Sequence, residues 1–265
     1  MKNVTYVYED GTVALDNVNI DLNKNKRIGI VGSNGAGKST MFMNFLGLLK
    51  PAEGKIYYGE EELSYNKKSL TELRKNVGIV FQDPDKQIFF SNVYDDIAFA
   101  LRNLKYDEKE ISERVETSMQ KTNISHLKNK PVHFLSYGQK KNVSIAGTIA
   151  MEQSLIFFDE PTAGLDRDSR ENIKDILNNL VEKENKSIVV SSHDMNFIYE
   201  VCDYIYVLNK GSVLTEGETR EVFLKKEILD EASLEEPFLI KVHKYLNIPL
   251  YKTEQELYEN KQPSK

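Results

Sequence analysis

The stretch Gly32-Ser-Asn-Gly-Ala-Gly-Lys38-Ser39-Thr40 has the form G-x-x-x-x-G-K-[ST], which is the pattern of a phosphate-binding loop. The apolar run 27–31 before it predicts a buried strand, and residues 41–46 after it predict a helix, which is the context the motif requires. Its glycines let the backbone wrap around phosphates, so that N–H groups and the positive helix start face the anion. Lys38 is expected to reach the β- and γ-phosphates of a nucleotide, and the Ser39 hydroxyl to bind Mg²⁺. The loop residues expected to bind the nucleotide are Gly32, Ser33, Asn34, Gly35, Ala36, Gly37, Lys38, Ser39 and Thr40.

Composition narrows the possible environments and ligands. The chain has 265 residues with a net charge of −6, which is not the basic balance typical of a nucleic-acid binder. No stretch approaches the ~20 apolar residues of a membrane span, and no signal pattern begins the sequence. A single cysteine, Cys202, excludes an internal disulfide and is typical of a cytosolic protein. The four histidines are too scattered to predict a structural metal site.

Strand-like and helix-like segments alternate along the chain, which predicts an α/β fold around a largely parallel sheet. Segments 3–8 and 13–22 alternate in polarity and are expected to form antiparallel strands joined by a turn at Asp10-Gly11. Further strands are expected at 54–59, 77–81, 154–158 and 187–191, and helices at 92–122, 137–150 and 167–183. Beyond residue 218 the pattern becomes helical and charged, and the tail from about 252 to 265 is expected to be frayed or flexible.

Two carboxylates, Asp159 and Glu160, follow the apolar run Leu155–Phe158. In a phosphate-loop protein, an acid at the end of a strand can hold Mg²⁺, and a second acid beside it can orient and polarise the attacking water. We therefore predict a metal-binding role for Asp159 and a catalytic role for Glu160.

Four further motifs give the chain a family resemblance. Leu135-Ser136-Tyr137-Gly138-Gln139 resembles the signature Leu-Ser-Gly-Gly-Gln of the ATP-binding-cassette (ABC) ATPases. Gln82 after the strand at 77–81, Ala163-Gly-Leu-Asp166 and His193 stand where that family has its Q-loop, D-loop and H-loop. The resemblance covers most of residues 3–218. It implies a nucleotide-binding domain over 1–218, with a phosphate-loop core, an antiparallel β subdomain and an inserted helical subdomain at about 83–145. A helical extension would then occupy 219–265.

The resemblance also implies roles for individual residues. Tyr8 would stack on adenine, with Tyr6 as the second choice. Gln82 would contact Mg²⁺ and report occupancy of the site, and His193 would bond the γ-phosphate. Mg²⁺ ligands would be Ser39, Gln82 and Asp159; catalytic residues would be Glu160, His193 and Gln82; and Ser136, Gly138, Gln139 and Asp166 would complete the ATP-binding set. In the family, Ser136 and Gly138 contact ATP bound by the opposite subunit, so this single cassette must pair head to tail with a second copy or a close paralogue.

Tyr137 departs from the glycine that most of the family has in the signature. The variant Tyr137–Lys141, together with 81–90, 93–99 and 144–151, resembles ATPases of cobalt importers of the energy-coupling-factor type. That implies a peripheral protein on the cytoplasmic face of the membrane, partnered by a transmembrane scaffold and a substrate-capture subunit, without a nucleic-acid partner. Nickel or another micronutrient, such as a vitamin, is the alternative solute, and the sequence shows no site for the carried ion.

Two other functions compete with transport. An ABC ATPase acting on DNA or ribosomes usually has two cassettes or a coiled-coil insertion, and neither is present. A regulatory module without turnover conflicts with Glu160, which fills the hydrolytic position. Two surface roles are also expected. Segment Gln87–Phe90 would dock the membrane partner, and the region after 218, with Leu239, Val242 and Leu246 at helical spacing, would either join two subunits or cap its own domain.

Overall fold

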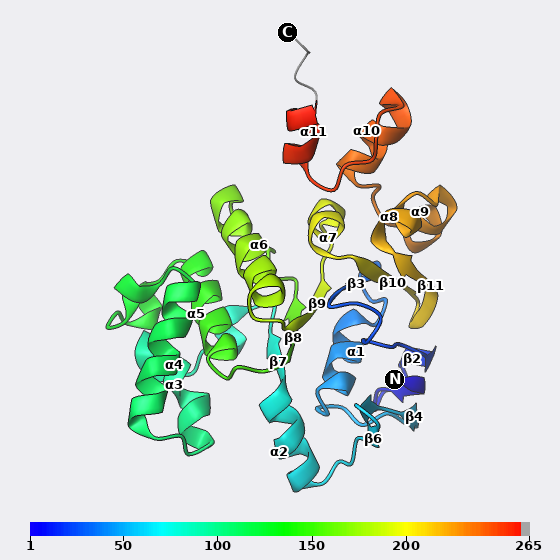
Figure 1. Cartoon of the computed structure of the whole chain (residues 1–265). Helices are drawn as coiled ribbons and strands as arrows, with labels where there is room; N and C mark the ends of the chain where they lie inside the picture. The colour runs from blue at the N-terminus through cyan, green and yellow to red at the C-terminus, as the bar shows by residue number, and fades with distance from the viewer. Residues whose placement is uncertain (261–265) are drawn as a thin grey trace. The chain divides into compact units, whose positions relative to one another are not determined.

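The computed structural model describes residues 1–260 (Figure 1). The chain forms two compact units. The first unit contains Met1–Phe45, Leu49–Tyr57 and the chain from Val190 onward, and the second contains Leu46–Leu48 and Tyr58–Val189. The predicted helical subdomain at about 83–145 lies within the second unit, and the predicted C-terminal extension belongs to the first.

An antiparallel sheet of order β2-β1-β4 begins the first unit. Its strands are β1 (Lys2–Val7), β2 (Val13–Val18) and β4 (Glu53–Lys55). Val4 faces Val18 across β1 and β2, and both are buried, so the alternating pattern places one face in the core. The expected turn is present, with the N–H of Gly11 donating to the carbonyl of Tyr8 at 2.9 Å.

A second group of strands in the first unit supports the phosphate loop. Strand β3 (Arg27–Val31) pairs in parallel with β10 (Tyr204–Asn209), which pairs antiparallel with β11 (Ser212–Glu218). The continuous apolar run of β3 is explained by its burial, since Ile28, Ile30 and Val31 are almost inaccessible. Helix α1 (Lys38–Phe45) follows the loop directly, and α7 (Met195–Val201) precedes β10.

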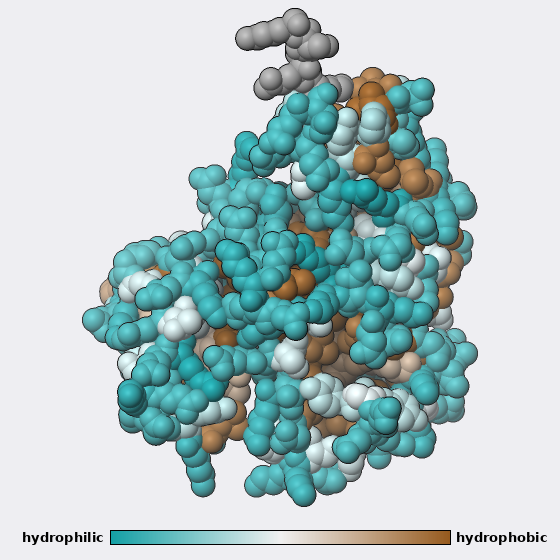
Figure 2. Space-filling model, viewed as in Figure 1, coloured by the Kyte–Doolittle hydropathy of each residue, from teal (hydrophilic) through white to brown (hydrophobic). Residues whose placement is uncertain are grey.

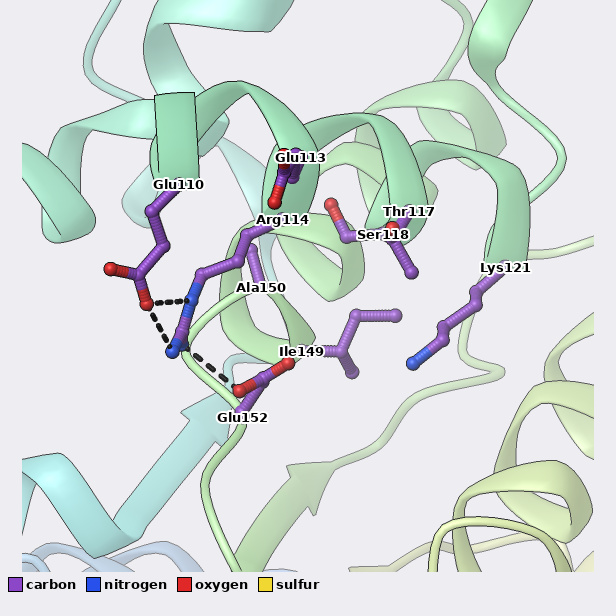
Figure 3. Close-up of a pocket in the computed structure, with 9 residues that line it drawn as sticks. All are labelled: Glu110, Glu113, Arg114, Thr117, Ser118, Lys121, Ile149, Ala150 and Glu152. Carbon is purple, nitrogen blue, oxygen red and sulfur yellow. Dashed lines mark hydrogen bonds and ion pairs between the residues drawn. The ribbon is translucent and has the colours of Figure 1, made fainter. Parts of the chain in front are cut away.

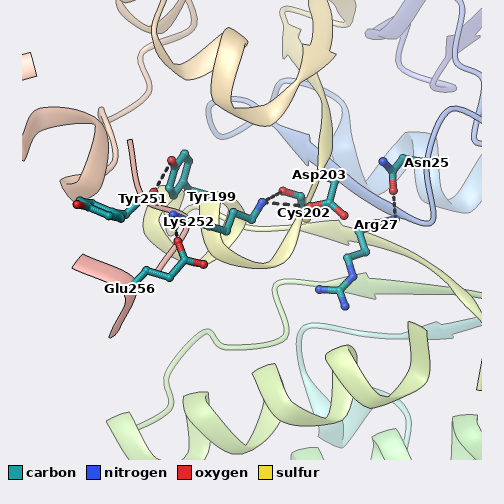
Figure 4. Close-up of polar contacts among 8 residues, drawn as sticks. All are labelled: Asn25, Arg27, Tyr199, Cys202, Asp203, Tyr251, Lys252 and Glu256. Atoms are coloured by element: carbon teal, nitrogen blue, oxygen red, sulfur yellow. Dashed lines mark hydrogen bonds and ion pairs between the residues drawn. The ribbon is translucent and has the colours of Figure 1, made fainter. Parts of the chain in front are cut away.

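Four short helices end the described chain: α8 (Thr219–Phe223), α9 (Lys226–Ala232), α10 (Phe238–Leu246) and α11 (Glu254–Asn260). Helix α11 differs from the frayed tail expected from about 252, because its Leu257 is buried and residues 251–252 are held by the body of the unit. The Tyr199 hydroxyl donates to the Tyr251 carbonyl at 2.7 Å, and Lys252 Nζ donates to the Cys202 carbonyl at 2.6 Å (Figure 4). Residues 261–265 of the expected tail lie outside the described residues.

The second unit pairs two buried strands in parallel, β7 (Val77–Val80) and β8 (Leu155–Asp159), in the register Val77 to Leu155. Its helices are α2 (Lys67–Asn76), α3 (Val93–Asn103), α4 (Glu108–Lys121), α5 (Tyr137–Ile149) and α6 (Arg167–Glu182). Short 3₁₀ turns occupy Pro84–Lys86, Ser125–Leu127 and Val132–Phe134. Strand β6 (Glu61–Glu62) also belongs to this unit, whereas β5 (Tyr57–Tyr58) and β9 (Ser187–Ser191) have residues in both units.

The single helix expected over 92–122 is two helices, α3 and α4. Lys105 adopts a left-handed conformation with φ of 62°, which ends the first helix, and Asp107 caps the second by accepting from the N–H of Glu110. The apolar faces of both helices pack with α5 in one cluster that includes Ile97, Val115 and Val143. Arg114 of α4 then bonds Glu110 at 2.8 Å and Glu152, beyond α5, at 3.2 Å (Figure 3).

Within residues 1–260, no helix combines the length and the apolar character that crossing a bilayer requires. Figure 2 shows a face covered mainly by hydrophilic residues, with hydrophobic residues gathered over α10. Three residues of that helix, Phe238, Tyr245 and Leu246, are exposed, while Leu239 and Ile240 are buried.

Candidate functional site

The phosphate loop of the first unit runs from the end of β3 to the start of α1, in the strand–loop–helix context that the sequence predicts. Gly37 has φ of 101°, and a Cβ added there would lie 2.6 Å from the Ala14 carbonyl oxygen, so glycine is required by both conformation and space. Lys38 is buried and its Nζ donates to the carbonyls of Gly32 at 2.7 Å and Ser33 at 3.1 Å. The lysine charge is therefore held inside the curve of the loop, where phosphates would bind.

Tyr8 lies beside the start of α1 in the same unit. Its hydroxyl is 2.8 Å from the Thr40 hydroxyl, and its ring makes an edge-to-face contact with Tyr6, with centroids 5.1 Å apart. Tyr8 is 40% exposed, whereas Tyr6 is half-buried. The Tyr8 side chain is therefore partly accessible beside Thr40, at the end of the phosphate loop, as a base-stacking residue needs to be. The adenine contact stays a prediction.

His193 also reaches the phosphate loop. It follows β9 at the start of α7, whose N-terminus is capped by Asp194 accepting from the N–H groups of Asn196 and Phe197. His193 Nε2 lies 3.5 Å from Lys38 Nζ, although the two residues are separated by 155 positions in sequence. The fold of the first unit thus brings together Lys38 and His193, two of the predicted site residues.

The two carboxylates of the second unit lie at the end of β8, as predicted. Asp159 and Glu160 are both buried, and Glu160 has φ of 45°, a left-handed conformation that is costly for a glutamate. Strain of this kind is concentrated at functional positions, where the surrounding structure maintains it. The observation supports a functional role for Glu160.

Gln82 follows β7 in the second unit, and its backbone is held by helix α5. The Gln82 carbonyl accepts hydrogen bonds from the Tyr137 hydroxyl at 3.1 Å and from Lys141 Nζ at 2.8 Å. Burial lowers the pKa of the Lys141 ammonium to about 8, while the charges of Asp159, Asp83 and Glu160 act in the opposite direction. Sequence reasoning missed Lys141, although its spacing of four from Tyr137 places both on one helix face.

The remaining predicted residues have local structural roles. Ser136 caps α5 and forms a capping box with Gln139, whose side-chain oxygen accepts from the Ser136 N–H at 3.1 Å. Gly138 lies on the same first turn, beside Ser169. Asp166 caps α6, and hydrogen bonds from Ser169 lower the pKa of its carboxyl. Capping the helices explains the presence of Gln139 and Asp166 without any contact to a nucleotide. The ATP-binding roles of these residues stay predictions.

Oxygen atoms are the ligands that Mg²⁺ prefers, and the three predicted metal ligands offer a hydroxyl, an amide and a carboxylate. Ser39 belongs to the first unit, while Gln82 and Asp159 belong to the second. The donor chemistry of the three residues therefore fits Mg²⁺. No cluster of three or more histidine, cysteine or acidic side chains suited to a metal ion occurs in the described part of the chain.

Two residues of the segment Gln87–Phe90, Gln87 and Phe89, line an apolar cleft of about 400 Å³ in the second unit. The Gln87 side chain donates to Thr148 Oγ1 at 3.0 Å and accepts from the Phe81 N–H at 3.0 Å, which ties the segment to α5 and to the end of β7. Phe89 is 75% exposed and Phe90 is 40% exposed, so both phenylalanines remain accessible. Their ring centroids lie 6.3 and 5.2 Å from that of Phe99.

A glycine-rich loop that holds a buried lysine, together with two buried acids after a buried strand, is typical of nucleotide-hydrolysing enzymes of the phosphate-loop class. The family model described as ABC transporter matches residues 15–163. The chain belongs to the ABC transporter family.

Several relatives carry names from the group that the signature variant indicated. The energy-coupling factor transporter ATP-binding protein EcfA2 of Clostridium perfringens is 41% identical over 89% of this chain and 83% of its own length. The cobalt import ATP-binding protein CbiO of Salmonella typhimurium is 42% identical over 94% of this chain and 91% of its own. The solved structure of cbiO1 from Clostridium perfringens, described as part of the transporter complex cbiONQ, is 39% identical with a TM-score of 0.78. The alignment covers 93% of this chain and 94% of the cbiO1 chain. These findings confirm the family resemblance and the predicted ABC ATPase fold.

Proposed function

We propose that the chain is the ATP-hydrolysing subunit that powers an importer of the energy-coupling-factor type, with cobalt ions as the first candidate solute. The observation that carries this proposal is the position of two exposed phenylalanines, Phe89 and Phe90. Phe89 and Phe90 stand exposed only a few residues after Gln82, and Gln87 ties them to the same strand end. In this proposal Gln82 senses ATP, and both the chain itself and the Gln87 hydrogen bond to Phe81 link it to exposed phenylalanines that dock the partner. Similarity to relatives named for cobalt import and energy coupling supports import as the direction of transport and cobalt as the first candidate solute.

The residues support a hydrolytic mechanism in which charge is stabilised at the γ-phosphate. Lys38 and the loop N–H groups would hold the phosphates, and Mg²⁺, bound by Ser39, Gln82 and Asp159, would neutralise the developing charge. Glu160 orients a water molecule and accepts its proton as the oxygen attacks the γ-phosphorus. The bond to the β–γ bridging oxygen then breaks, giving ADP and phosphate. His193 donates a hydrogen bond to the γ-phosphate, and its proximity to Lys38 is consistent with a shared phosphate target.

The catalytic site is completed by a second subunit in this proposal. Ser136 and Gly138 stand at the exposed, N-terminal end of α5, where the helix start can meet phosphate oxygens of a nucleotide held by a partner cassette. A second copy of this chain or a close paralogue can supply that cassette. The transmembrane scaffold and the solute-capture subunit are separate chains, and the ATPase works as a peripheral subunit on the cytoplasmic face of the membrane.

Uptake by the reconstituted complex tests the function and the solute together. The tagged chain is purified from membranes of its own source, its partners are identified, and the complex is placed in vesicles containing an ATP-regenerating system. Accumulation of ⁵⁷Co²⁺ driven by ATP, and absent with the Glu160→Gln variant, is the expected result. Accumulation of ⁶³Ni²⁺ or of a vitamin instead of cobalt would support the alternative solute. Recovery of the chain with ribosomes or DNA, and with no membrane protein, would contradict transport.

A further inference from the structure

Helix α5 grips the backbone at Gln82 with two side chains that lie four residues apart. Tyr137 donates its hydroxyl hydrogen to the Gln82 carbonyl at 3.1 Å. Lys141 Nζ donates to the same carbonyl and to that of Phe81, both at 2.8 Å. Residues at positions i and i+4 share one face of a helix, so both side chains extend from α5 toward the same strand end.

Lys141 has a position that its residue type does not favour. Its relative exposure is 0%, and lysine is almost never fully buried unless its ammonium is partnered. Two of its three N–H donors meet the carbonyls just described. An apolar residue of similar length would fill the space on α5 without this desolvation. The buried charge therefore has a use beyond packing, and its partners place that use at the end of β7, where the chain turns into the Gln82 segment.

Tyr137 also lies near the Ala163–Asp166 loop. Gly164 has φ of 74°, and a Cβ added there would lie 3.6 Å from Tyr137 Cε1. The aromatic ring thus lies near one functional loop, while its hydroxyl bonds the Gln82 carbonyl of another. A glycine at position 137 would lose that hydrogen bond. The departure from the usual signature residue consequently gives the chain a link between the helix start and the Gln82 segment.

We propose that Tyr137 and Lys141 are positioning residues that fasten the backbone at Gln82 to the first two turns of α5, so that Gln82 and the helix carrying Ser136 and Gly138 move as one piece. This inference rests on the proposed function, because it assigns a task within the same ATPase site. The clamp keeps the Gln82 side chain in the geometry needed for hydrolysis. Neither side chain of the clamp contacts the reacting atoms in this assignment.

The variant Tyr137→Phe isolates the clamp, because it removes one hydrogen bond and keeps the ring. We expect kcat for ATP to fall roughly threefold to tenfold, the effect of one lost hydrogen bond, with the Kd for ATP changed less than about twofold. Hydrogen–deuterium exchange of peptides covering 81–87 should become faster, while exchange in α4 stays the same. Tyr58→Phe is the matched control, since Tyr58 is an exposed tyrosine at 40% on another element, and it should change neither readout.

Lys141→Met and Lys141→Arg test the second half of the clamp. The methionine variant should lower kcat further and increase exchange at 81–87, and arginine should restore part of both because it keeps the donors. If Lys141→Met fails to fold, Tyr137→Phe and Lys141→Arg still decide the question. Wild-type kcat and wild-type exchange at 81–87 in Tyr137→Phe would overturn the inference. Such a result leaves the transport proposal standing, because vesicle uptake by the wild-type complex is measured separately.

Discussion

Lys38 Nζ and His193 Nε2 lie 3.5 Å apart, so the ammonium of the phosphate loop and the imidazole after β9 face the same small volume. Two groups in contact that act on one phosphate should not contribute independently. Lys38→Ala is expected to weaken ATP binding itself, because the loop loses the charge held at its centre. His193→Ala is expected to lower kcat with a smaller effect on binding.

A double-mutant cycle measures this coupling. The Kd for ATP and the kcat are determined for Lys38→Ala, His193→Ala and the double variant. We expect the two effects to deviate from additivity by about 0.5–3 kcal/mol, the range for residues in contact. Strict additivity would show that the two side chains serve different parts of the substrate.

Glu160→Gln should leave ATP binding intact and nearly abolish turnover. The amide keeps the shape of the side chain but loses the negative charge that polarises the attacking water. Loss of general-base assistance costs about 10²–10⁴-fold in rate. Single-turnover hydrolysis and equilibrium binding are the two measurements, and size-exclusion chromatography with ATP should show the variant accumulating as a closed dimer. Normal steady-state hydrolysis would remove Glu160 from the catalytic role.

Phe89→Ser and Phe90→Ser should weaken assembly with the membrane partner and uncouple transport, while basal ATPase activity of the isolated subunit stays near the wild-type value. Burial of one exposed phenylalanine contributes roughly 1.5–3 kcal/mol, which changes an association constant by tenfold or more. Co-purification from membranes is the measurement. Phe134→Ser is the control, since Phe134 is 67% exposed but lies outside the segment Gln87–Phe90 and does not line the cleft. Wild-type recovery of the complex with both variants would place docking elsewhere.

The exposed end of α10 should contribute to contact between two subunits in the absence of nucleotide. Of the three residues that the helical spacing grouped together, Leu239 is buried within its own unit, Val242 is half-buried and Leu246 is 57% exposed. Leu239 and Ile240 therefore cap the domain, while Tyr245 and Leu246, at the end of the helix, are exposed to a partner, as is Phe238 at its start. Tyr245→Glu and Leu246→Glu should convert a nucleotide-free dimer into monomers in light scattering. Tyr258→Glu, at an exposed position of α11, is the control, and a dimer that survives the α10 changes makes α10 a cap only.

The thiol of Cys202 should be unreactive in the native protein and become reactive when the protein unfolds. Burial raises the pKa of this thiol to about 12 from 9.0. Since the unfolded chain loses the proton first, the free energy of unfolding falls as pH rises from 9 toward 12. At pH 10 the loss should be about 1.4 kcal/mol relative to Cys202→Ala. Urea titrations of both proteins at pH 8 and 10 measure it, and an equal response of the two proteins would contradict it. Ellman's reagent at pH 8 should label wild type only after denaturation.

Much of the fold could be predicted because strong local signals coincide with burial. The run Arg27–Val31 forms β3 and Leu155–Asp159 forms β8, since an uninterrupted apolar run must be covered on both faces. The long helix over 92–122 was predicted wrongly, because the turn chemistry of Lys105 and Asp107 outweighs an apolar spacing that continues across it. Helix α2 was missed, since only Leu73 of its residues is buried and its apolar pattern is correspondingly weak.

The site was predicted from motifs more completely than from geometry. Contacts between residues distant in sequence, such as Lys38 with His193 and Tyr137 with Gln82, depend on chain topology that no local pattern contains. The local capping duties of Gln139 and Asp166 were also absent from the sequence argument, although Ser136 followed three residues later by Gln139 is a recognisable capping box. The buried Lys141 could have been suspected from its face of the helix but not from its residue type.

The left-handed backbone at Glu160, with φ of 45°, sets stability against activity at a single position. Glycine or asparagine tolerates that conformation better than glutamate, so either replacement would relieve backbone strain while removing the group that polarises water. Selection for heat resistance alone would therefore enrich inactive sequences at this position. A library screened for stabilised variants of this ATPase must keep residue 160 as glutamate. Otherwise the screen will enrich variants that bind ATP without hydrolysing it.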